Sequence, residues 1–323
     1  MTESNDAKKA LHVATLSGWY RFERDGREWK QTKRDLSYWS LTCMSVDPEN
    51  PQKIYAGTEH SGLFYTDNAG ASWNRAQPNV PKMMLFAILA LNGRVMVGTI
   101  PSAVYRSKNG GWEELEGVRI NSAGANFPPS PELQSRTRYL TFDPASPNRI
   151  YAGIEVGGML VSDDDGQNWQ PANEGLTDMD IHEVLASRST AGLVFAACGE
   201  AAFRSFDRAA HWEAITPKSH DYGTSVAEDN DGVVYLGSAK GRPNGWIRKE
   251  GAMAAIFRSQ DKGSTWEKII DNLKGGVMHM CPLPDGKGMI AGTSDGSLLV
   301  VDDAGAREIV TGLPFVTSVE LAA

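Results

Sequence analysis

The sequence predicts an all-β fold: a seven-bladed β-propeller of four-stranded antiparallel blades, with the C-terminal strand closing blade one. Three observations predict it. A turn octet recurs along the chain, a second-strand signature occurs in seven segments, and the last strand has no adjacent segment with which to pair. An octet that repeats every few tens of residues is typical of repeat architectures. Short strands rich in β-branched and aromatic residues, separated by regular turns, indicate blades of four strands.

The octet is most complete at Ser259-x-Asp261-x-Gly263-x-Thr265-Trp266. In such a turn the Ser and Asp side chains bond turn amides, Gly takes a positive φ angle, and Trp fills the gap between sheets. The octet therefore builds the fold and does no chemistry. Three less complete copies carry Ser162, Asp164, Gly166, Asn168 and Trp169; Ser205, Asp207, Ala209 and Trp212; and Thr66, Asn68, Gly70, Ser72 and Trp73.

Aligned on these turns, the chain divides into seven units, each with an apolar inner strand, a second strand that ends like Ile-Tyr-Ala-Gly, a third strand, a turn, and a fourth strand. Six units carry a Trp at the start of the fourth strand, at Trp29, Trp73, Trp112, Trp169, Trp212 and Trp266. The second-strand signatures lie at 12–15, 54–57, 95–98, 150–153, 194–197, 234–237 and 289–292. We expect residues 1–10 to form a disordered tail and 11–323 to form a single propeller.

The two ends of the chain predict how the ring closes. The first unit begins directly at its second strand, 11–15, and the chain ends in an unpartnered strand, 315–321. Placing the last strand innermost in blade one pairs both ends and removes an open sheet edge. No convincing amphipathic helix is found anywhere in the sequence.

Composition and charge narrow the partners. The 323 residues carry a net charge of -8 with a pI near 5.3, which disfavours nucleic acid and acidic membranes as partners. Cys43, Cys198 and Cys281 form no C-x-x-C pair, which favours buried reduced thiols. The N-terminus lacks the apolar core of a secretory signal, so a cytoplasmic protein is expected. The expected partner is a small-molecule substrate. The oligomeric state does not follow from the sequence.

The octet resembles the Asp-box, or BNR repeat, of sialidase-like β-propellers, and this resemblance covers nearly the whole chain. It implies that a functional site lies near the central channel, on the face opposite the octet turns. Two insertions, 119–135 before the inner strand of blade four and 239–254 between the second and third strands of blade six, project from that face. Long loops in compact domains are often functional, so the insertions are interpreted either as a lid or as tolerated additions.

Polar residues gather at the same predicted face. They follow second strands or begin inner strands, at Tyr38, Trp39, Glu59, His60, Arg136, Arg138, Glu155, Asp180, His182, Glu200, His220, Tyr222, His279 and Asp295. We predict that His60, His182 and His279 converge on a divalent metal (Zn, Mn, Fe or Ca) or supply an acid and a base. The catalytic candidates are Glu155, Glu200, Arg138 and Tyr222. The competing interpretation is that each histidine bonds the backbone of an apolar strand.

The resemblance does not extend to catalytic residues. The chain has no Arg-Ile-Pro motif and no visible arginine triad of the sialidase type, and it lacks the length of the two-propeller xyloglucan hydrolases. Phosphate loops and dinucleotide fingerprints are also missing, so no organic cofactor is expected.

Two functional hypotheses remain. The first is an intracellular lyase or hydrolase acting on a small organic molecule or sugar derivative at the channel mouth. The second is a noncatalytic binding propeller, similar to lectin propellers or to the BNR-type assembly factors of photosystem subunits. The clustering of polar residues at channel-facing positions favours the enzyme.

Overall fold

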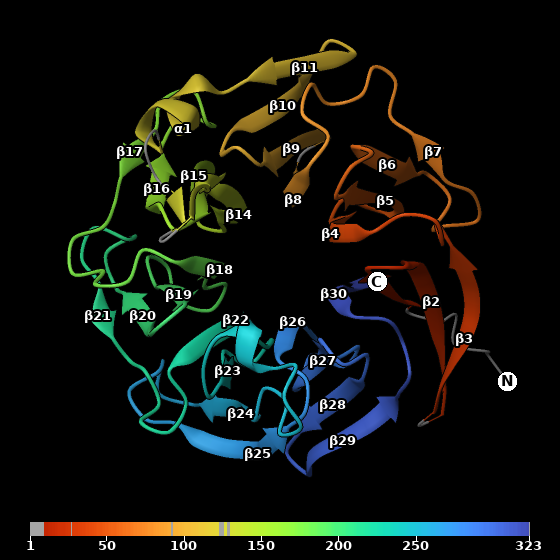
Figure 1. The fold of residues 1–323 in the computed structure, drawn as a ribbon, viewed down its shortest axis with the longest axis vertical. Helices are drawn as coiled ribbons and strands as arrows, with labels where there is room; N and C mark the ends of the chain where they lie inside the picture. The colour runs from red at the N-terminus through yellow and green to blue at the C-terminus, as the bar shows by residue number, and fades with distance from the viewer. Residues whose placement is uncertain (1–9, 27, 92, 123–125, 128–129, 323) are drawn as a thin grey trace, which may run out of the picture.

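The computed structural model describes residues 10–26, 28–91, 93–122, 126–127 and 130–322, and forms a ring of seven four-stranded antiparallel sheets (Figure 1). The predicted fold class is therefore confirmed. Of the predicted tail, only Ala10 lies among the described residues, where it begins a strand. From the inner to the outer strand, the blades are β30 (Val316–Ala322), β1 (Ala10–Thr15), β2 (Gly18–Asp25), β3 (Glu28–Asp35); β4 (Leu41–Asp47), β5 (Asn50–Thr58), β6 (Leu63–Thr66), β7 (Asn74–Arg75); β8 (Leu85–Leu91), β9 (Arg94–Thr99), β10 (Val104–Lys108), β11 (Gly111–Glu114); β14 (Arg136–Asp143), β15 (Ser146–Glu155), β16 (Gly158–Ser162), β17 (Gln170–Pro171); β18 (Ile181–Ala186), β19 (Val194–Cys198), β20 (Ala202–Ser205), β21 (Glu213–Ala214); β22 (Tyr222–Glu228), β23 (Val234–Ala239), β24 (Ala254–Ser259), β25 (Glu267–Leu273); and β26 (Val277–Pro282), β27 (Met289–Thr293), β28 (Leu298–Asp302), β29 (Gly305–Val310).

The C-terminal strand closes the ring as predicted. β30 is the innermost strand of blade one and pairs antiparallel with β1, with Leu11 opposite Leu321 and Val13 opposite Val319. β30 also contacts the inner strands of the two neighbouring blades, β26 of blade seven and β4 of blade two. The two ends of the chain are thereby held in one sheet.

The octet turns form the interactions expected from their side chains. At 162–169 the Gly166 N–H donates to Ser162 Oγ at 2.8 Å, and the Asn168 N–H donates to Asp164 Oδ1 at 2.8 Å. Gly166 has a φ of 82°, which an L side chain rarely adopts. The copy at 259–266 repeats the same bonds around Ser259 and Asp261.

Asp164→Ala is expected to lower the free energy of unfolding by about 1–3 kcal/mol, because the turn loses the acceptor of the Asn168 amide. Asp261→Ala should shift stability in the same direction, since Asp261 accepts from the Thr265 N–H at 2.8 Å. Urea unfolding curves measure both changes, with the exposed Asp221→Ala as the matched control. An Asp164→Ala protein with the unfolding midpoint of the parent would contradict this assignment.

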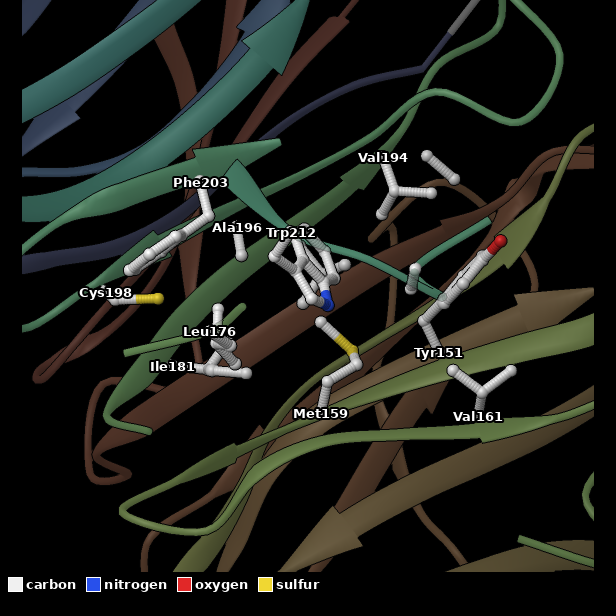
Figure 2. Close-up of a cluster of buried hydrophobic side chains, with 13 residues drawn as sticks. Tyr151, Met159, Val161, Leu176, Ile181, Val194, Ala196, Cys198, Phe203 and Trp212 are labelled. Carbon is white, nitrogen blue, oxygen red and sulfur yellow. The ribbon is translucent and has the colours of Figure 1, made fainter. Parts of the chain in front are cut away.

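The tryptophan after each octet packs into the gap toward the preceding blade. In Figure 2, Trp212 of blade five lies among Tyr151, Met159 and Val161 of blade four. Its indole Nε1 donates to Ala172 O at 2.8 Å, so the buried ring is also hydrogen-bonded. These apolar gaps are the core of the protein.

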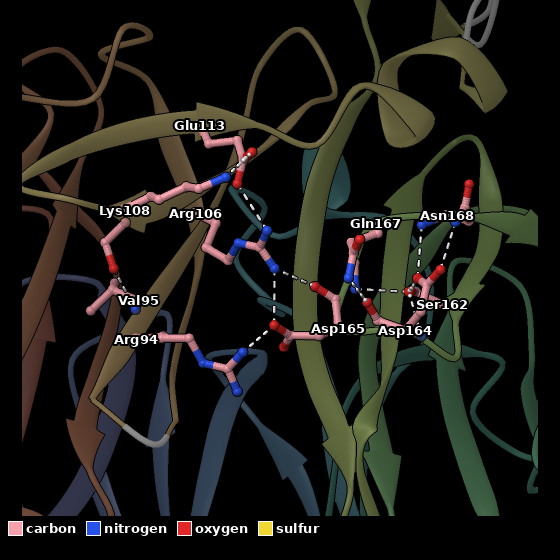
Figure 3. A network of polar contacts seen from close by, with 12 residues as sticks. Arg94, Val95, Arg106, Lys108, Glu113, Ser162, Asp164, Asp165, Gln167 and Asn168 are labelled. Carbon is pink, nitrogen blue, oxygen red and sulfur yellow. Dashed lines mark hydrogen bonds and ion pairs between the residues drawn. The ribbon is translucent and has the colours of Figure 1, made fainter.

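Ion pairs join neighbouring blades at the rim that carries the octets. Figure 3 shows Arg94 and Arg106 of blade three reaching Asp165 in the octet turn of blade four. Arg106 Nη1 lies 2.9 Å from Asp165 Oδ2, and its Nη2 lies 2.8 Å from Glu113 Oε2. Ion pairs between charged side chains at the octet rim therefore hold neighbouring blades together.

Glycine in the second-strand signature lets the inner strand of the next blade approach. A Cβ at Gly153 would lie 2.7 Å from Ile181, and one at Gly292 would lie 2.5 Å from Val316. Blade five has Ala197 at this position, and there Gly223 on the facing strand supplies the space instead. The blades therefore still approach closely where the second-strand signature has no glycine.

The insertions differ from their expected form in one respect. The segment predicted as a plain loop at 119–135 contains the end of α1 (Glu116–Asn121) and a two-stranded sheet of β12 (Asn126–Phe127) and β13 (Ser130–Gln134). The second insertion is a loop as predicted, between β23 and β24, with one short 3-10 helix, η1 (Pro243–Gly245).

Candidate functional site

All seven inner strands carry a β-bulge at their second or third residue. At each bulge the strand pairing skips one residue, which is left out of the ladder. Bulges re-aim side chains and are frequent beside active sites. We call these seven positions the bulge ring: Thr42, Phe86, Arg138, His182, Thr224, Met278 and Thr317.

The bulge ring surrounds one end of the central channel, which we call the channel mouth. Inner strands begin and second strands end there, and strand direction places the octet turns on the opposite face. Two predicted residues, Arg138 and His182, belong to the ring. Glu155 at the end of β15 and Tyr222 at the start of β22 lie at the same end of the channel.

Glu155 is held as a carboxylate by arginines. Arg136 makes two contacts with it, through Nε to Oε2 and through Nη2 to Oε1 at 2.6 Å. Arg138 Nε lies 3.8 Å from Glu155 Oε2. Burial opposes ionisation, yet the charges of Arg138 and Arg136 lower the pKa of Glu155 below its usual value.

His182 is oriented by the backbone of the next blade. Its Nδ1 lies 2.6 Å from Gly223 O, a carbonyl that can only accept, so Nδ1 carries a proton; in the neutral ring Nε2 then keeps its lone pair. Nε2 lies 3.3 Å from Tyr222 Oη and 3.6 Å from Asp180 Oδ1. Burial raises the pKa of Tyr222, so its hydroxyl keeps its proton and can donate to His182.

Asp180 completes the group. Burial opposes its ionisation, but the contact with His182 and the charges of Arg242 and Arg136 lower its pKa. Its Oδ1 is buried without a hydrogen-bond partner among the described residues. We call Arg136, Arg138, Glu155, Asp180, His182 and Tyr222 the mouth cluster.

The predicted convergence of three histidines on one metal is wrong. Within the described part of the chain, one group of three potential ligands has its ligand atoms all within 4.8 Å of one another, and it consists of Glu155, Asp180 and His182. The His60 side chain is 71% exposed and its Nε2 lies 3.8 Å from Glu59. The Nδ1 of His279 lies 3.0 Å from Val319 O, so this ring bonds backbone deeper in the channel.

Glu200 also lies outside the mouth cluster. Its side chain is 69% exposed, and its Oε1 accepts from Arg242 Nη2 at 2.6 Å. Arg242 belongs to the insertion of blade six, and Trp246 of the same insertion packs edge-on against Tyr222 with ring centroids 6.0 Å apart. This insertion therefore reaches the rim of the mouth.

Inside the mouth lies a cavity of about 400 Å³, which we call the chamber. Inner strands of six blades line it, and Arg138 and His182 of the mouth cluster border it. The chamber contains polar groups that the sequence did not single out: Tyr139, Glu183, Arg188 and Glu320. For Glu183 and Glu320, the signal available in the sequence was a charged residue within an apolar strand.

Burial favours the neutral form of two chamber carboxyls. Burial raises the pKa of Glu183 to about 8 and that of Glu320 to about 8. Val226 N–H donates to Glu183 Oε2 at 3.3 Å, and Tyr139 hydrogen-bonds the same carboxyl. Glu320 makes no hydrogen bond or ion pair with any residue that the structure describes; the charge of Arg188 opposes the burial effect without overcoming it.

Glu320→Gln is expected to stabilise the protein at about pH 8 and to have little effect at about pH 5. The unfolded carboxyl ionises near 4.5, whereas the folded one stays protonated up to about 8. The unfolded state therefore releases its proton first, and the stability of the native protein falls as the pH rises through this window. Gln cannot ionise, so the variant escapes this loss.

Thermal unfolding at the two pH values measures the effect, with Glu116→Gln at the outer edge of the ring as the control. Equal shifts at both pH values would show that Glu320 ionises normally in the folded protein.

Two xyloglucan-degrading enzymes are similar to this chain in sequence, and no protein-family model matches it. An oligoxyloglucan-reducing end-specific xyloglucanase of Emericella nidulans is 23% identical over 50% of this chain and 22% of that enzyme. A probable enzyme of the same name from Neosartorya fischeri is 22% identical over 81% of this chain. The chain spans 38% of that second relative's length, well under half of either.

Solved structures share the fold. The GH74 xyloglucanase from Xanthomonas campestris superposes with a TM-score of 0.70 at 17% identity, covering 97% of this chain and 52% of that one. YCF48 bound to D1 peptide superposes with a TM-score of 0.59 at 19% identity, covering 90% of this chain and 92% of that one. At such identities these likenesses establish the propeller fold alone.

No helix within the described ranges is long and apolar enough to cross a membrane.

Proposed function

We propose that the mouth cluster is an active site that cleaves a sugar derivative or other small organic molecule, as a hydrolase or a lyase. One observation carries the proposal: a buried imidazole with its lone pair on Nε2 lies 3.3 Å from a protonated tyrosine hydroxyl, at the entrance of a cavity. A base and an acid held this close can act on the two sides of one bond.

In this mechanism His182 Nε2 takes a proton, either from an attacking water or from a substrate carbon. Tyr222 donates its proton to the leaving oxygen as the bond breaks. The contact between the two groups then lets the imidazolium return a proton to the tyrosinate, which restores the starting state. Asp180, 3.6 Å from Nε2, stabilises the transient positive charge on His182.

The arginines give the site a preference for negative charge. Arg136 is committed to Glu155, whereas Arg138 lies 3.8 Å from the same carboxylate and borders the chamber. Arg138 therefore serves as the substrate-binding guanidinium for a carboxylate or another anionic group. The low pKa values of Glu155 and Asp180 leave the role of general acid to Tyr222.

A divalent cation (Zn, Mn, Fe or Ca) would be held by Glu155, Asp180 and His182. The fit rests on the His182 Nδ1–H bond to a carbonyl, an arrangement usual for metal-ligating histidines, and on the unpartnered Asp180 Oδ1. When bound, such a cation would polarise a substrate oxygen.

The test is a cleavage assay on neutral and acidic oligosaccharides, xyloglucan fragments included, with elemental analysis of protein purified without a His-tag. Mass spectrometry separates the two reactions, since hydrolysis adds one water and elimination adds none. Asp180→Asn should abolish cleavage, and with it any stoichiometric metal, whereas His211→Ala at the octet rim should retain both. If no substrate of either class is cleaved, the enzymatic proposal fails.

A binding propeller is the second candidate, because the mouth face exposes apolar groups and the propeller fold is shared with YCF48, which was solved bound to D1 peptide. The mouth face exposes Tyr38 (96%) and Ile247 (92%), the type of residue that forms partner contacts. Under this proposal the mouth cluster binds an anionic group without turnover.

A further inference from the structure

We infer that the chamber is a binding site for a small organic ammonium ion, held between Glu183 and Glu320 and packed against the aromatic side chains of the channel. The inference concerns groups below the mouth cluster, and binding in the chamber does not require that the mouth be catalytic.

The described residues place no cationic side chain in direct contact with Glu183 or Glu320, so a bound cation would favour the ionised form of these carboxyls. No lysine or arginine lies within ion-pair distance of either carboxyl among the described residues, although the two repel each other when ionised. The charge of Arg138, which lies 3.8 Å from Glu155, opposes the effect of burial on the pKa of Glu183 without overcoming it. The charge of Arg188, at the far end of the chamber, does the same for Glu320. A ligand cation would supply a positive charge beside these carboxyls.

The other chamber groups suit an ammonium group rather than compete with it. His279 Nδ1 lies 3.0 Å from Val319 O and 3.4 Å from Val319 N; in the tautomer that donates the shorter bond, the bare Nε2, 3.6 Å from Glu183 Oε1, can accept an N–H. Tyr139, Phe142 and Phe315 also line the chamber, and aromatic faces attract cations.

Size and spacing favour an organic ion over a metal. The chamber holds about 400 Å³, more than a bare ion fills. Glu183, His279 and Glu320 do not form a group with ligand atoms within 4.8 Å of one another in the described chain. The guanidinium of Arg188 opposes a second positive charge at the far end, which favours a monoamine over a diamine.

Ammonium binding would also release a proton, because it favours the ionised Glu320 carboxyl, whose pKa of about 8 keeps it protonated in the free protein. Glu183 on β18 lines the same chamber. The other titratable or charged groups that line the chamber are Cys43 on β4, Arg138 and Tyr139 on β14, His182 and Arg188 on and after β18, and His279 on β26. Burial raises the pKa of Cys43 to about 12 and lowers that of His279 to about 4, so neither contributes protons near neutral pH.

The test is isothermal titration calorimetry near pH 7.5 with benzylamine and its neutral isostere benzyl alcohol, in two buffers of different ionisation enthalpy. We expect saturable binding of benzylamine at one site, at least about ten-fold weaker binding of the alcohol, and proton release on binding of the amine. Glu320→Gln and Glu183→Gln should each weaken amine binding by about ten-fold or more, and Glu116→Gln on α1 should leave it unchanged.

Several outcomes would overturn the inference. They are equal affinity for the amine and the alcohol, uptake rather than release of protons, unchanged affinity in the Glu183→Gln/Glu320→Gln double variant, and no binding of benzylamine, tyramine or butylamine at about 10 mM. Circular dichroism of each variant confirms folding before titration. None of these readouts involves turnover, so failure here is distinct from failure of the proposed active site.

Discussion

Removal of residues 315–323 is expected to abolish the cooperative unfolding transition of the propeller and to make the protein insoluble. β30 pairs along the whole of β1, and Val316 and Val319 are fully buried. Each buried side chain of this size contributes about 1.5–3 kcal/mol, before the loss of a complete strand ladder is counted. Domains of this kind have a total margin of about 5–15 kcal/mol, so the loss is comparable with the entire stability.

The truncation also removes contacts to both neighbouring blades. Thr317 Oγ donates to Leu41 O of blade two at 2.9 Å, and Val319 O accepts from His279 Nδ1 of blade seven at 3.0 Å. The edge of β1 would then be open to pairing with other molecules.

Calorimetry and sedimentation measure this outcome. Removal of residues 322–323 alone is the control, because it preserves the pairs from Val316 to Leu321. A protein lacking 315–323 that melts like its parent would show that blade one closes without β30.

His182→Ala and Tyr222→Phe are each expected to lower kcat/KM by about 10²–10⁴-fold on the substrate identified by the cleavage assay, since each removes one partner of the acid–base pair. Tyr222→Phe keeps the ring that packs against Trp246 and loses only the hydroxyl. The double variant should be little worse than either single variant, because the two groups act as one unit.

His211→Ala is the matched control for this pair. His211 is exposed at the octet rim, where it pairs with Asp207 at 2.6 Å, far from the mouth in the topology of the blade. Full activity in folded His182→Ala would remove the imidazole from the mechanism. Binding of an oligosaccharide without cleavage by the parent protein would favour the binding propeller instead.

The ring could be predicted from the sequence because its determinants are local and repeated. Each octet carries its own turn bonds, and the lone first and last strands leave one way to close the sheet. Strand order also brings Arg138, Glu155, His182 and Tyr222 to one end of the channel, as expected.

Burial could not be predicted in the same way. Residues that follow second strands are either buried, as Glu155 is, or exposed, as His60 and Glu200 are. Nothing in the local pattern separates the two cases. The chamber acids Glu183 and Glu320 were missed because alternation assigns a strand residue to a face without saying whether that face borders a cavity.

The bulge ring has a consequence for how such a protein can change. Its seven residues lie outside the strand ladder. A substitution at one of them therefore changes a side chain at the channel mouth and leaves the pairing register unchanged. The same backbone site already holds threonine, phenylalanine, arginine, histidine and methionine in different blades. The seven bulge-ring residues can therefore be varied while the backbone of the blades stays the same. Diversifying these seven codons is a way to select new binding specificities at the mouth.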